Sequence, residues 1–328
     1  MPISFRPATR ANVGILVGLS GPSGGGKTMS AMRMAQGIVG REGRFAVVDT
    51  EKGRALHYAP QAGEEPDFTS TFRFDHAEMD APFHPAAYAE AIQSADAAGY
   101  KVIVVDSMSH EWAGDGGILD WQEMELDRMA GDDWKKRESC KMAAWIKPKM
   151  AHKQMMQKLL QVRANLILCF RAEPKIEMIR ENGKTVIVPK QSLTGLEGYI
   201  PVCEKSLPFE LTASFLVTPD APGMPKPIKL QEQHRALFPL NQPIDEESGR
   251  KIAAWGSGVV KTPIQHLTDA HTIAIQAAET VEALKEAFTV AQSEARAAKD
   301  AGRLARYVQL KEERKTALEN PPDVPEPA

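Results

Sequence analysis

The chain contains the octapeptide Gly21-Pro22-Ser23-Gly24-Gly25-Gly26-Lys27-Thr28, and this stretch decides the fold that we expect. It fits the pattern G-x-x-x-x-G-K-[ST] at every fixed position. The apolar run from Val13 to Leu19 before it is typical of a buried strand, and the segment from Met29 to Val39 after it has its apolar residues at helical spacing. A strand, a glycine-rich turn and a helix in this order predict an α/β fold with a mainly parallel sheet.

The octapeptide has the chemistry of a phosphate-binding loop. Glycines let consecutive backbone N–H groups curl around an anion, and the helix that follows adds the positive end of its dipole. Lys27 would reach the β- and γ-phosphates of a nucleoside triphosphate, and Thr28 would ligate Mg²⁺. We therefore expect a site for ATP and Mg²⁺ formed by Gly21 to Thr28 and the next residue, Met29. The alternative is a glycine-rich turn with a chance Gly-Lys-Thr, which leaves the flanking strand and helix unexplained.

A second predicted strand ends in a carboxylate. The run Lys101-Val102-Ile103-Val104-Val105-Asp106-Ser107 is continuously apolar and β-branched before Asp106, as in a central parallel strand. Asp106 would then lie at the carboxyl edge of the sheet beside the phosphate loop, where it would hold Mg²⁺. The alternative is a core strand whose Asp caps the next segment.

The residue after Asp106 is Ser107, where many P-loop ATPases have a catalytic Glu. Glu51 is our candidate for the general base, because it ends the strand-like run Phe45-Ala46-Val47-Val48-Asp49-Thr50-Glu51 directly after the predicted helix. A carboxylate at the tip of a neighbouring strand can activate a water molecule. Glu111 is the rival candidate, and a solvated charge at a strand end is the other interpretation of Glu51.

These segments resemble the RecA family of recombinase ATPases, and within it the small phage RecA-like ATPases of single-strand annealing and recombination. The resemblance covers about residues 10–218 and rests on Gly21 to Thr28, Phe45 to Gly53 and Val102 to Ser107. It implies a RecA-like ATPase in which Lys27, Glu51 and Asp106 act in catalysis. Glu51, at the end of its strand, is the residue that selects this family among P-loop proteins.

A fourth segment, Asn165 to Arg171, is similar to the next core strand of the family, which ends in a γ-phosphate sensor. The resemblance gives this role to Arg171, in place of the family's usual amide. Lys205 is a candidate for a cation that reaches the nucleotide of a neighbouring subunit. The alternative for Lys205 is an ordinary surface lysine.

Charge is segregated along the middle of the chain, although the whole chain carries a net charge of only −3. Residues 111–133 hold eight acids and one base, a net charge of −7. Residues 135–190 hold fourteen bases and four acids, a net charge of +10. The net charge of +10 over residues 135–190 predicts an anionic partner.

Tryptophan accompanies this positive charge, since four of the five tryptophans lie between Ser107 and Pro148. Aromatic faces beside cations suit sequence-tolerant binding of single-stranded DNA. An Asn182-Gly183 turn also predicts a hairpin over residues 175–190, in the place of a DNA loop of the resembled family. The candidate DNA contacts are Lys135, Lys136, Arg137, Trp145, Lys147, Lys149, Arg180 and Lys184. The alternative is that the tryptophans pack a small helical insertion whose lysines are solvated.

The sequence divides into four predicted regions. The resemblance implies a RecA-like ATPase core over residues 1–218, with a last strand over Phe209 to Thr218, and the composition predicts a proline-rich linker with an ambiguous segment over residues 219–262. A helical appendage spans 263–320, and a disordered tail spans 321–328.

Three cysteines stand at no metal-ligand spacing, and Cys169 lies in an apolar run, which favours a reducing compartment. No signal peptide or membrane-spanning run is evident, so we expect the cytoplasm, of the host cell if the protein is phage-encoded, and no membrane partner. Two function hypotheses follow. One is a Mg²⁺-dependent ATPase that assembles on single-stranded DNA as a homo-oligomeric ring or filament, with a recombination partner on its C-terminal helices. The other is a nucleotide switch that acts on a protein partner through those helices without touching DNA.

Overall fold

The structure is a computed structural model that describes residues 13–181, 184–189, 198–257, 264–297 and 301–319. The chain divides into two units, residues 1–259 and 260–328. The predicted disordered tail lies outside the described residues, as does the predicted Asn182-Gly183 turn. Among the described residues, no helix is both long enough and apolar enough to cross a membrane.

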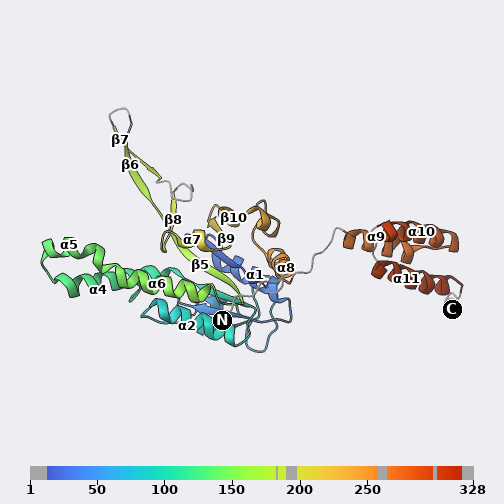
Figure 1. Ribbon diagram of the computed structural model, residues 1–328, viewed down its shortest axis with the longest axis horizontal. Helices are drawn as coiled ribbons and strands as arrows, with labels where there is room; N and C mark the ends of the chain where they lie inside the picture. Colours follow the sequence, from blue (N-terminus) through green and yellow to red (C-terminus); the bar gives the residue numbers. More distant parts are fainter. Residues whose placement is uncertain (1–12, 182–183, 190–197, 258–263, 298–300, 320–328) are drawn as a thin grey trace, which may run out of the picture. The chain divides into compact units, whose positions relative to one another are not determined.

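The first unit is built on one mostly parallel sheet, with strand order β10-β9-β1-β5-β4-β2-β3 and β8 paired with the end of β5 (Figure 1). All neighbours in that order are parallel except β10 with β9. The strands are β1 (Leu16–Gly21), β2 (Phe45–Asp49), β3 (Phe74–Glu78), β4 (Val102–Asp106), β5 (Asn165–Pro174), β8 (Tyr199–Pro201), β9 (Ala213–Thr218) and β10 (Ala221–Leu230). This is the α/β fold class that the sequence predicts.

Helices cover both faces of the sheet because its central strands are apolar on both faces. Along β5, Ile167 and Cys169 face one core, and Leu166, Leu168 and Phe170 face the other. Helices α1 (Lys27–Val39) and α8 (Glu246–Gly256) close the first core, and α2 (Pro85–Ala97) and α6 (Ile146–Leu159) close the second. Shorter elements are η1 (Arg54–Tyr58), α3 (Ser109–Ala113), α7 (Leu207–Glu210) and η2 (Glu232–Leu237).

The prediction of a linker over residues 219–227 is wrong. This segment is most of strand β10, which pairs antiparallel with β9 through two register shifts. Its prolines are tolerated because β10 is an edge strand, where a missing N–H costs no ladder bond. The predicted last strand also begins later, at Ala213 rather than Phe209, because residues 207–210 form α7.

The ambiguous segment after β10 belongs to the first unit as far as residue 257. Helix α8 crosses α1 at close range, which the absence of a side chain on Gly37 permits. A Cβ on Gly37 would lie 2.1 Å from the carbonyl oxygen of Glu246. The Arg33 guanidinium also donates two hydrogen bonds, of 2.8 and 2.7 Å, to the carboxylate of Glu246. The ATPase core therefore extends well beyond the predicted boundary at residue 218.

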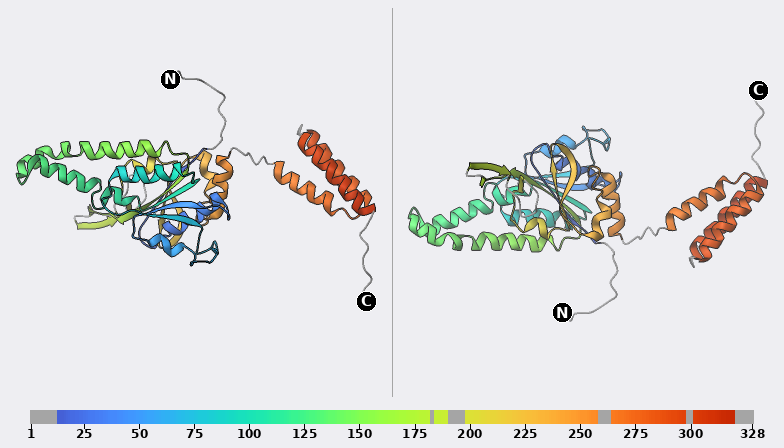
Figure 2. Two further views of the ribbon diagram at one scale, coloured as in Figure 1. Left: turned by 90° about the horizontal axis from the view of Figure 1, so that it is seen from below. Right: turned by 90° about the horizontal axis from the view of Figure 1, so that it is seen from above.

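Two projections leave the sheet where β4 and β5 end (Figures 1 and 2). The first, which we call the arm, consists of α4 (Ile118–Ala130), α5 (Trp134–Ala144) and α6. The second, which we call the ribbon, is the antiparallel pair β6 (Ile176–Glu181) and β7 (Lys184–Pro189), as the hairpin pattern predicts. The apolar face of Met150 to Arg163 (Ala151, Met155, Leu159 and Val162) predicts a helix over this segment, and it corresponds to α6, which starts four residues earlier and ends at Leu159.

The second unit contains three helices, α9 (Ile264–Ala277), α10 (Val281–Ala297) and α11 (Ala301–Glu319), within its described residues. They share a core that includes Ile275, Leu284, Ala291 and Tyr307. These helices form the C-terminal appendage of the predicted fold class.

Candidate nucleotide-binding site

The glycine-rich loop lies between β1 and α1 and is shaped by contacts with the last two strands. Gly24 and Gly26 have φ angles of 80° and 86°, in the left-handed region that favours glycine. A Cβ on Gly25 would lie 2.6 Å from the carbonyl oxygen of Val217 in β9, and one on Gly26 would lie 2.7 Å from the nitrogen of Gly223 in β10. The segment expected to be a linker therefore supports the phosphate loop.

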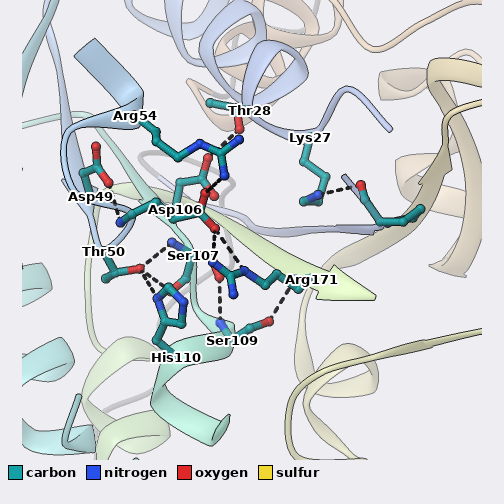
Figure 3. Close-up of polar contacts among 12 residues, drawn as sticks. Lys27, Thr28, Asp49, Thr50, Arg54, Asp106, Ser107, Ser109, His110 and Arg171 are labelled. Carbon is teal, nitrogen blue, oxygen red and sulfur yellow. Dashed lines mark hydrogen bonds and ion pairs between the residues drawn. The ribbon is translucent and has the colours of Figure 1, made fainter. Parts of the chain in front are cut away.

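The first helical residues carry the two side chains that the motif assigns to nucleotide and metal. Lys27 Nζ donates a 2.9 Å hydrogen bond to the carbonyl oxygen of Pro22, so the lysine arches over the loop (Figure 3). Thr28 Oγ1 donates a 2.6 Å hydrogen bond to Asp106 Oδ2 (Figure 3). The predicted magnesium ligands, which are 78 residues apart, are thus in direct contact.

The Asp106 carboxyl is almost fully buried. Burial raises its pKa to about 6 from the ordinary value of 3.8, and the nearby carboxylates of Glu51 and Asp49 add to the rise. The hydrogen bond from Thr28 and the charge of Lys27 oppose the rise. A buried carboxyl of raised pKa beside a hydroxyl is suited to a cation, because a bound cation would compensate the cost of the buried charge.

The donor set fits Mg²⁺. Mg²⁺ is usually held by one or two carboxylates, a hydroxyl and the oxygens of substrate phosphates. The described residues contain no cluster of three or more His, Cys, Asp or Glu that would form an all-protein metal site. Thr28 and Asp106 would therefore hold the ion together with the phosphates.

Glu51 lies in the same cavity, held by two arginines. Its Oε1 accepts hydrogen bonds of 3.0 and 2.7 Å from Nε and Nη2 of Arg171, and its Oε2 accepts one of 2.8 Å from Nη1 of Arg54. Strand pairing explains why Glu51 and Arg171 lie close together. Asp49 of β2 is level with Asp106 of β4, and Asp106 is level with Cys169 of β5. Glu51 and Arg171 each lie two residues beyond these positions, at the same edge of the sheet.

A polar network behind the site fixes this edge. Asp49 accepts hydrogen bonds from the backbone N–H of Glu51 (2.6 Å) and of Ala55 (2.9 Å), which holds the loop that carries Glu51. Thr50 Oγ1 accepts a 2.8 Å hydrogen bond from the N–H of Ser107 and lies 2.7 Å from Nδ1 of His110 (Figure 3). The segments after β2 and β4 are thereby tied to each other.

The rival base, Glu111, occupies a different place. It is buried in α3, 1% exposed, and its Oε1 lies 2.9 Å from Nδ1 of His152 in α6. Glu111 is absent from the lining of the nucleotide cavity, whereas Glu51 belongs to it. The geometry therefore favours Glu51 as the residue that faces a nucleotide.

The cavity has a volume of about 620 Å³, enough for a nucleotide. It brings together the predicted residues of the loop except Gly25, and Met29, Glu51, Asp106 and Arg171. Sequence reasoning missed Arg54, His57, Tyr58 and Glu173, which also line it. The signal for the first three was the polar segment directly after Glu51, where Lys52 (φ 55°) and Gly53 (φ 76°) turn the chain back into η1.

The predicted DNA contacts fall into two groups. Members of the first are engaged within the arm: Arg137 pairs with Glu123 and Asp127, and Lys147 pairs with Glu125. Trp145 is half-buried and stacks on Trp112, with 5.9 Å between ring centroids and 18° between ring planes, and Lys149 lies over its ring. These contacts are those of the alternative interpretation, in which tryptophans pack a helical insertion.

Members of the second group are exposed. Lys135 and Lys136 lie at the tip of the arm beside Trp134, which is 72% exposed. Arg180 and Lys184 lie on the ribbon, level with Thr185 and Glu181. Lys205 is exposed in a turn before α7 and does not line the nucleotide cavity. Its role in trans stays a prediction.

The glycine-rich loop leads from strand β1 into helix α1, and the neighbouring Asp106 carboxyl ends strand β4. This arrangement defines a P-loop protein of the ATPase superfamily. A profile of the AAA domain family matches residues 14–196, more than half of the chain, and the chain belongs to this family. No curated protein matches the sequence.

Proposed function

We propose that the protein is a RecA-like, Mg²⁺-dependent ATPase that couples ATP binding and hydrolysis to homo-oligomeric assembly on single-stranded DNA in phage recombination or annealing. One observation carries the ATPase part of the proposal. The Thr28–Asp106 contact and the Glu51 carboxylate lie around a single cavity, so the metal ligands and a candidate base meet at the end of the phosphate loop.

The residues of the cavity have distinct roles in this proposal. Lys27 binds the phosphates after it leaves the carbonyl oxygen of Pro22. Mg²⁺, when bound, withdraws negative charge from the phosphate oxygens. Glu51 takes a proton from the attacking water, as a general base within reach of the terminal phosphate.

The arginines give the site a resting arrangement. Arg171 donates two hydrogen bonds to Oε1 of Glu51 and Arg54 donates one to Oε2, so three of the roughly four acceptor sites of the carboxylate are occupied. Departure of a guanidinium would free more of the carboxylate for the attacking water. The γ-phosphate is the natural new partner of Arg171, since guanidinium groups bind phosphate oxygens through paired hydrogen bonds.

Exposed side chains support the choice of single-stranded DNA. Trp134 is 72% exposed, with Lys135 Nζ 6.0 Å from its ring centroid, and Lys135 and Lys136 form no ion pair with described residues. Stacking next to unpaired cations is the arrangement used for sequence-tolerant binding of single strands. The ribbon adds Arg180 and Lys184 on a projection that continues from the strand of Arg171.

One observation favours the alternative, a nucleotide switch that clamps a protein partner through the C-terminal helices. The second unit exposes apolar side chains outside its own core, among them Ile273 at 64% and Val290 at 49%. In that case the arm and the ribbon would not contact DNA.

The test measures ATP turnover with and without single-stranded DNA, and DNA affinity as a function of salt. We expect DNA to stimulate turnover. The DNA affinity of Lys135→Ala/Lys136→Ala should depend less on salt than that of the wild type: the slope of log K against log salt concentration should be smaller by roughly 0.7 for each phosphate that the variant no longer neutralises. Lys285→Ala, which removes an exposed lysine in the second unit, is the matched control. DNA binding that is absent, or unchanged in the double variant, would favour the switch.

A further inference from the structure

The outer helix of the arm runs almost without interruption from Trp134 to Leu159. Trp145, between α5 and α6, keeps helical angles (φ −75°, ψ −17°), and its carbonyl oxygen accepts a 3.1 Å hydrogen bond from the N–H of Lys149. Ala144, Pro148 and His152 lie on the buried side of this helix. The residues two positions before each of them lie about 200° further round the helix, on the outward side.

Those outward residues are Met142, Ile146 and Met150, and they are 80%, 64% and 54% exposed. Their i, i+4, i+8 spacing aligns them in a stripe about 12 Å long. Single exposed apolar residues are ordinary, but an aligned row of three is the signature of a helix face that meets a partner. We call this row the methionine stripe.

Positive charge flanks the methionine stripe. Lys149 and Lys153 lie on the same side of the helix, are exposed, and form no ion pair with described residues. Lys149 contacts the ring of Trp145, with Nζ 5.6 Å from the ring centroid, which leaves its charge without a carboxylate. A complementary partner therefore offers apolar side chains bordered by acids.

The other helix of the same arm has these properties. On α4, Met124 is 65% exposed, and the exposed acids Asp120, Glu123 and Asp127 surround it at spacings of one to four residues. Arg137 of α5 pairs with the last two, which places α5 to one side of Met124 rather than over it, and the exposed Arg128 pairs with Glu125. Three acids against the single charge of Arg137 leave the border of this apolar spot net negative, opposite in charge to the methionine stripe.

We propose that the methionine stripe is a docking surface for α4 of a second copy of this chain. Each arm carries both halves of the contact on different faces, so docking joins the stripe of one copy to α4 of the next. Such a heterologous contact repeats and gives a ring or a filament. Aliphatic side chains give bases no flat surface on which to stack, which distinguishes this face from the Trp134 tip proposed for DNA.

The inference deepens the assembly step of the proposed function, on which it rests, by naming a surface for it. One helix pair is a small interface, so the arm contact alone is weak and concentration-dependent. Its charges make it sensitive to salt as well.

Sedimentation velocity of the nuclease-treated full chain, with ATP and Mg²⁺ and without DNA, tests the proposal. Met142→Ser/Ile146→Ser/Met150→Ser should weaken self-association by about tenfold or more, because the aligned apolar row is removed from the interface. Val308→Ser, an exposed apolar residue of the second unit, is the matched control and should sediment as the wild type. Unchanged melting temperatures would show that the variants are folded.

A charge exchange makes the test specific. Lys149→Glu/Lys153→Glu gives an acidic stripe, and Asp120→Lys/Asp127→Lys gives a basic α4. Each variant alone should dissociate, because like charges meet. An equimolar mixture should reassociate, because alternating copies restore opposite charges at every contact.

Several results would overturn the proposal. A wild-type chain that stays monomeric, stripe variants that associate normally, or a mixture that does not reassociate would each do so. Stripe variants that associate normally but no longer bind DNA would identify the stripe as a nucleic-acid surface. The proposed function is tested separately, since DNA-stimulated turnover could fail while arm-dependent association persists.

Discussion

Replacing Asp106 with Asn should stabilise the free protein at neutral pH, although it removes a proposed magnesium ligand. Burial raises the pKa of this carboxyl from 3.8 to about 6. The folded chain therefore binds the proton more tightly than the unfolded chain, and ionisation of Asp106 destabilises the fold. The cost is absent well below pH 3.8, grows between the two pKa values and is complete above pH 6. A shift of about two pKa units corresponds to about 3 kcal/mol of unfolding free energy.

The Asn side chain can accept the hydrogen bond of Thr28 without carrying a charge, so it reproduces the protonated form. Urea unfolding in EDTA, followed by tryptophan fluorescence, measures the difference. All five tryptophans lie within residues 1–259, so the signal reports on the first unit alone. We expect Asp106→Asn to be more stable than the wild type by about 3 kcal/mol near pH 7.5 and by less than about 1 kcal/mol near pH 4.

The same variant should lose the rise in melting temperature that ATP with Mg²⁺ gives the wild type. Asp115→Asn, which changes an exposed carboxyl, is the control and should alter neither quantity. If Asp106→Asn is no more stable than the wild type near pH 7.5, the buried charge is not the cost that we infer. A gain that is equal at both pH values would also refute the reasoning, because it would not come from ionisation.

Three further predictions concern neighbouring residues. Glu51→Gln should bind ATP and turn over on the order of 10²-fold more slowly, as measured by phosphate release, whereas Glu111→Gln should retain most of its turnover. Glu111→Gln should instead lower the unfolding free energy more near pH 6 than near pH 9. Burial lowers the pKa of His152, but the hydrogen bond and charge of Glu111 outweigh it and raise that pKa. The protonated His152 therefore stabilises the fold at low pH, and this stabilisation is lost as pH rises through the raised pKa. Gly26→Ala should abolish the ATP-induced rise in melting temperature, since its Cβ would collide with β10. Gly40→Ala should keep that rise and lose only the stability that a side chain at a left-handed φ of 77° costs the fold.

The sequence predicts the elements that are encoded by contiguous residues. The phosphate loop, the strand that ends at Asp106 and the hairpin around residues 182–183 each have their signal within about ten residues. Periodicity and turn chemistry act over this range, so the observed elements lie close to their predicted positions. The prediction of a linker after residue 218 is wrong for the same reason. Its prolines indicate a breaker locally, and only pairing with β9 makes the segment an edge strand.

The arrangement of the site depends on contacts that no local pattern contains. Glu51 and Arg171 are 120 residues apart, and they meet because β4 lies between β2 and β5 in the sheet. The end of its predicted strand makes Glu51 a candidate, and the family resemblance makes Arg171 one, but neither argument predicts their ion pair. Arg54 joins them because the turn at Gly53 folds η1 back towards Glu51. The resting arrangement of the candidate base is therefore a property of the fold alone.

Charge in the middle of the chain shows the limit of counting along a sequence. Helix α4 of the acidic window packs against α5 and α6, the first part of the basic window, so part of the contrast is used internally, as in the pairing of Arg137 with Glu123 and Asp127. The charge available to a partner is the part that remains after such pairs are counted. On the arm this part includes Lys135 and Lys136 at the tip, beside an exposed tryptophan, and Lys149 and Lys153 along the methionine stripe. Because the two sets border different apolar surfaces, one aromatic and one aliphatic, a single basic segment can serve two partners of different chemistry.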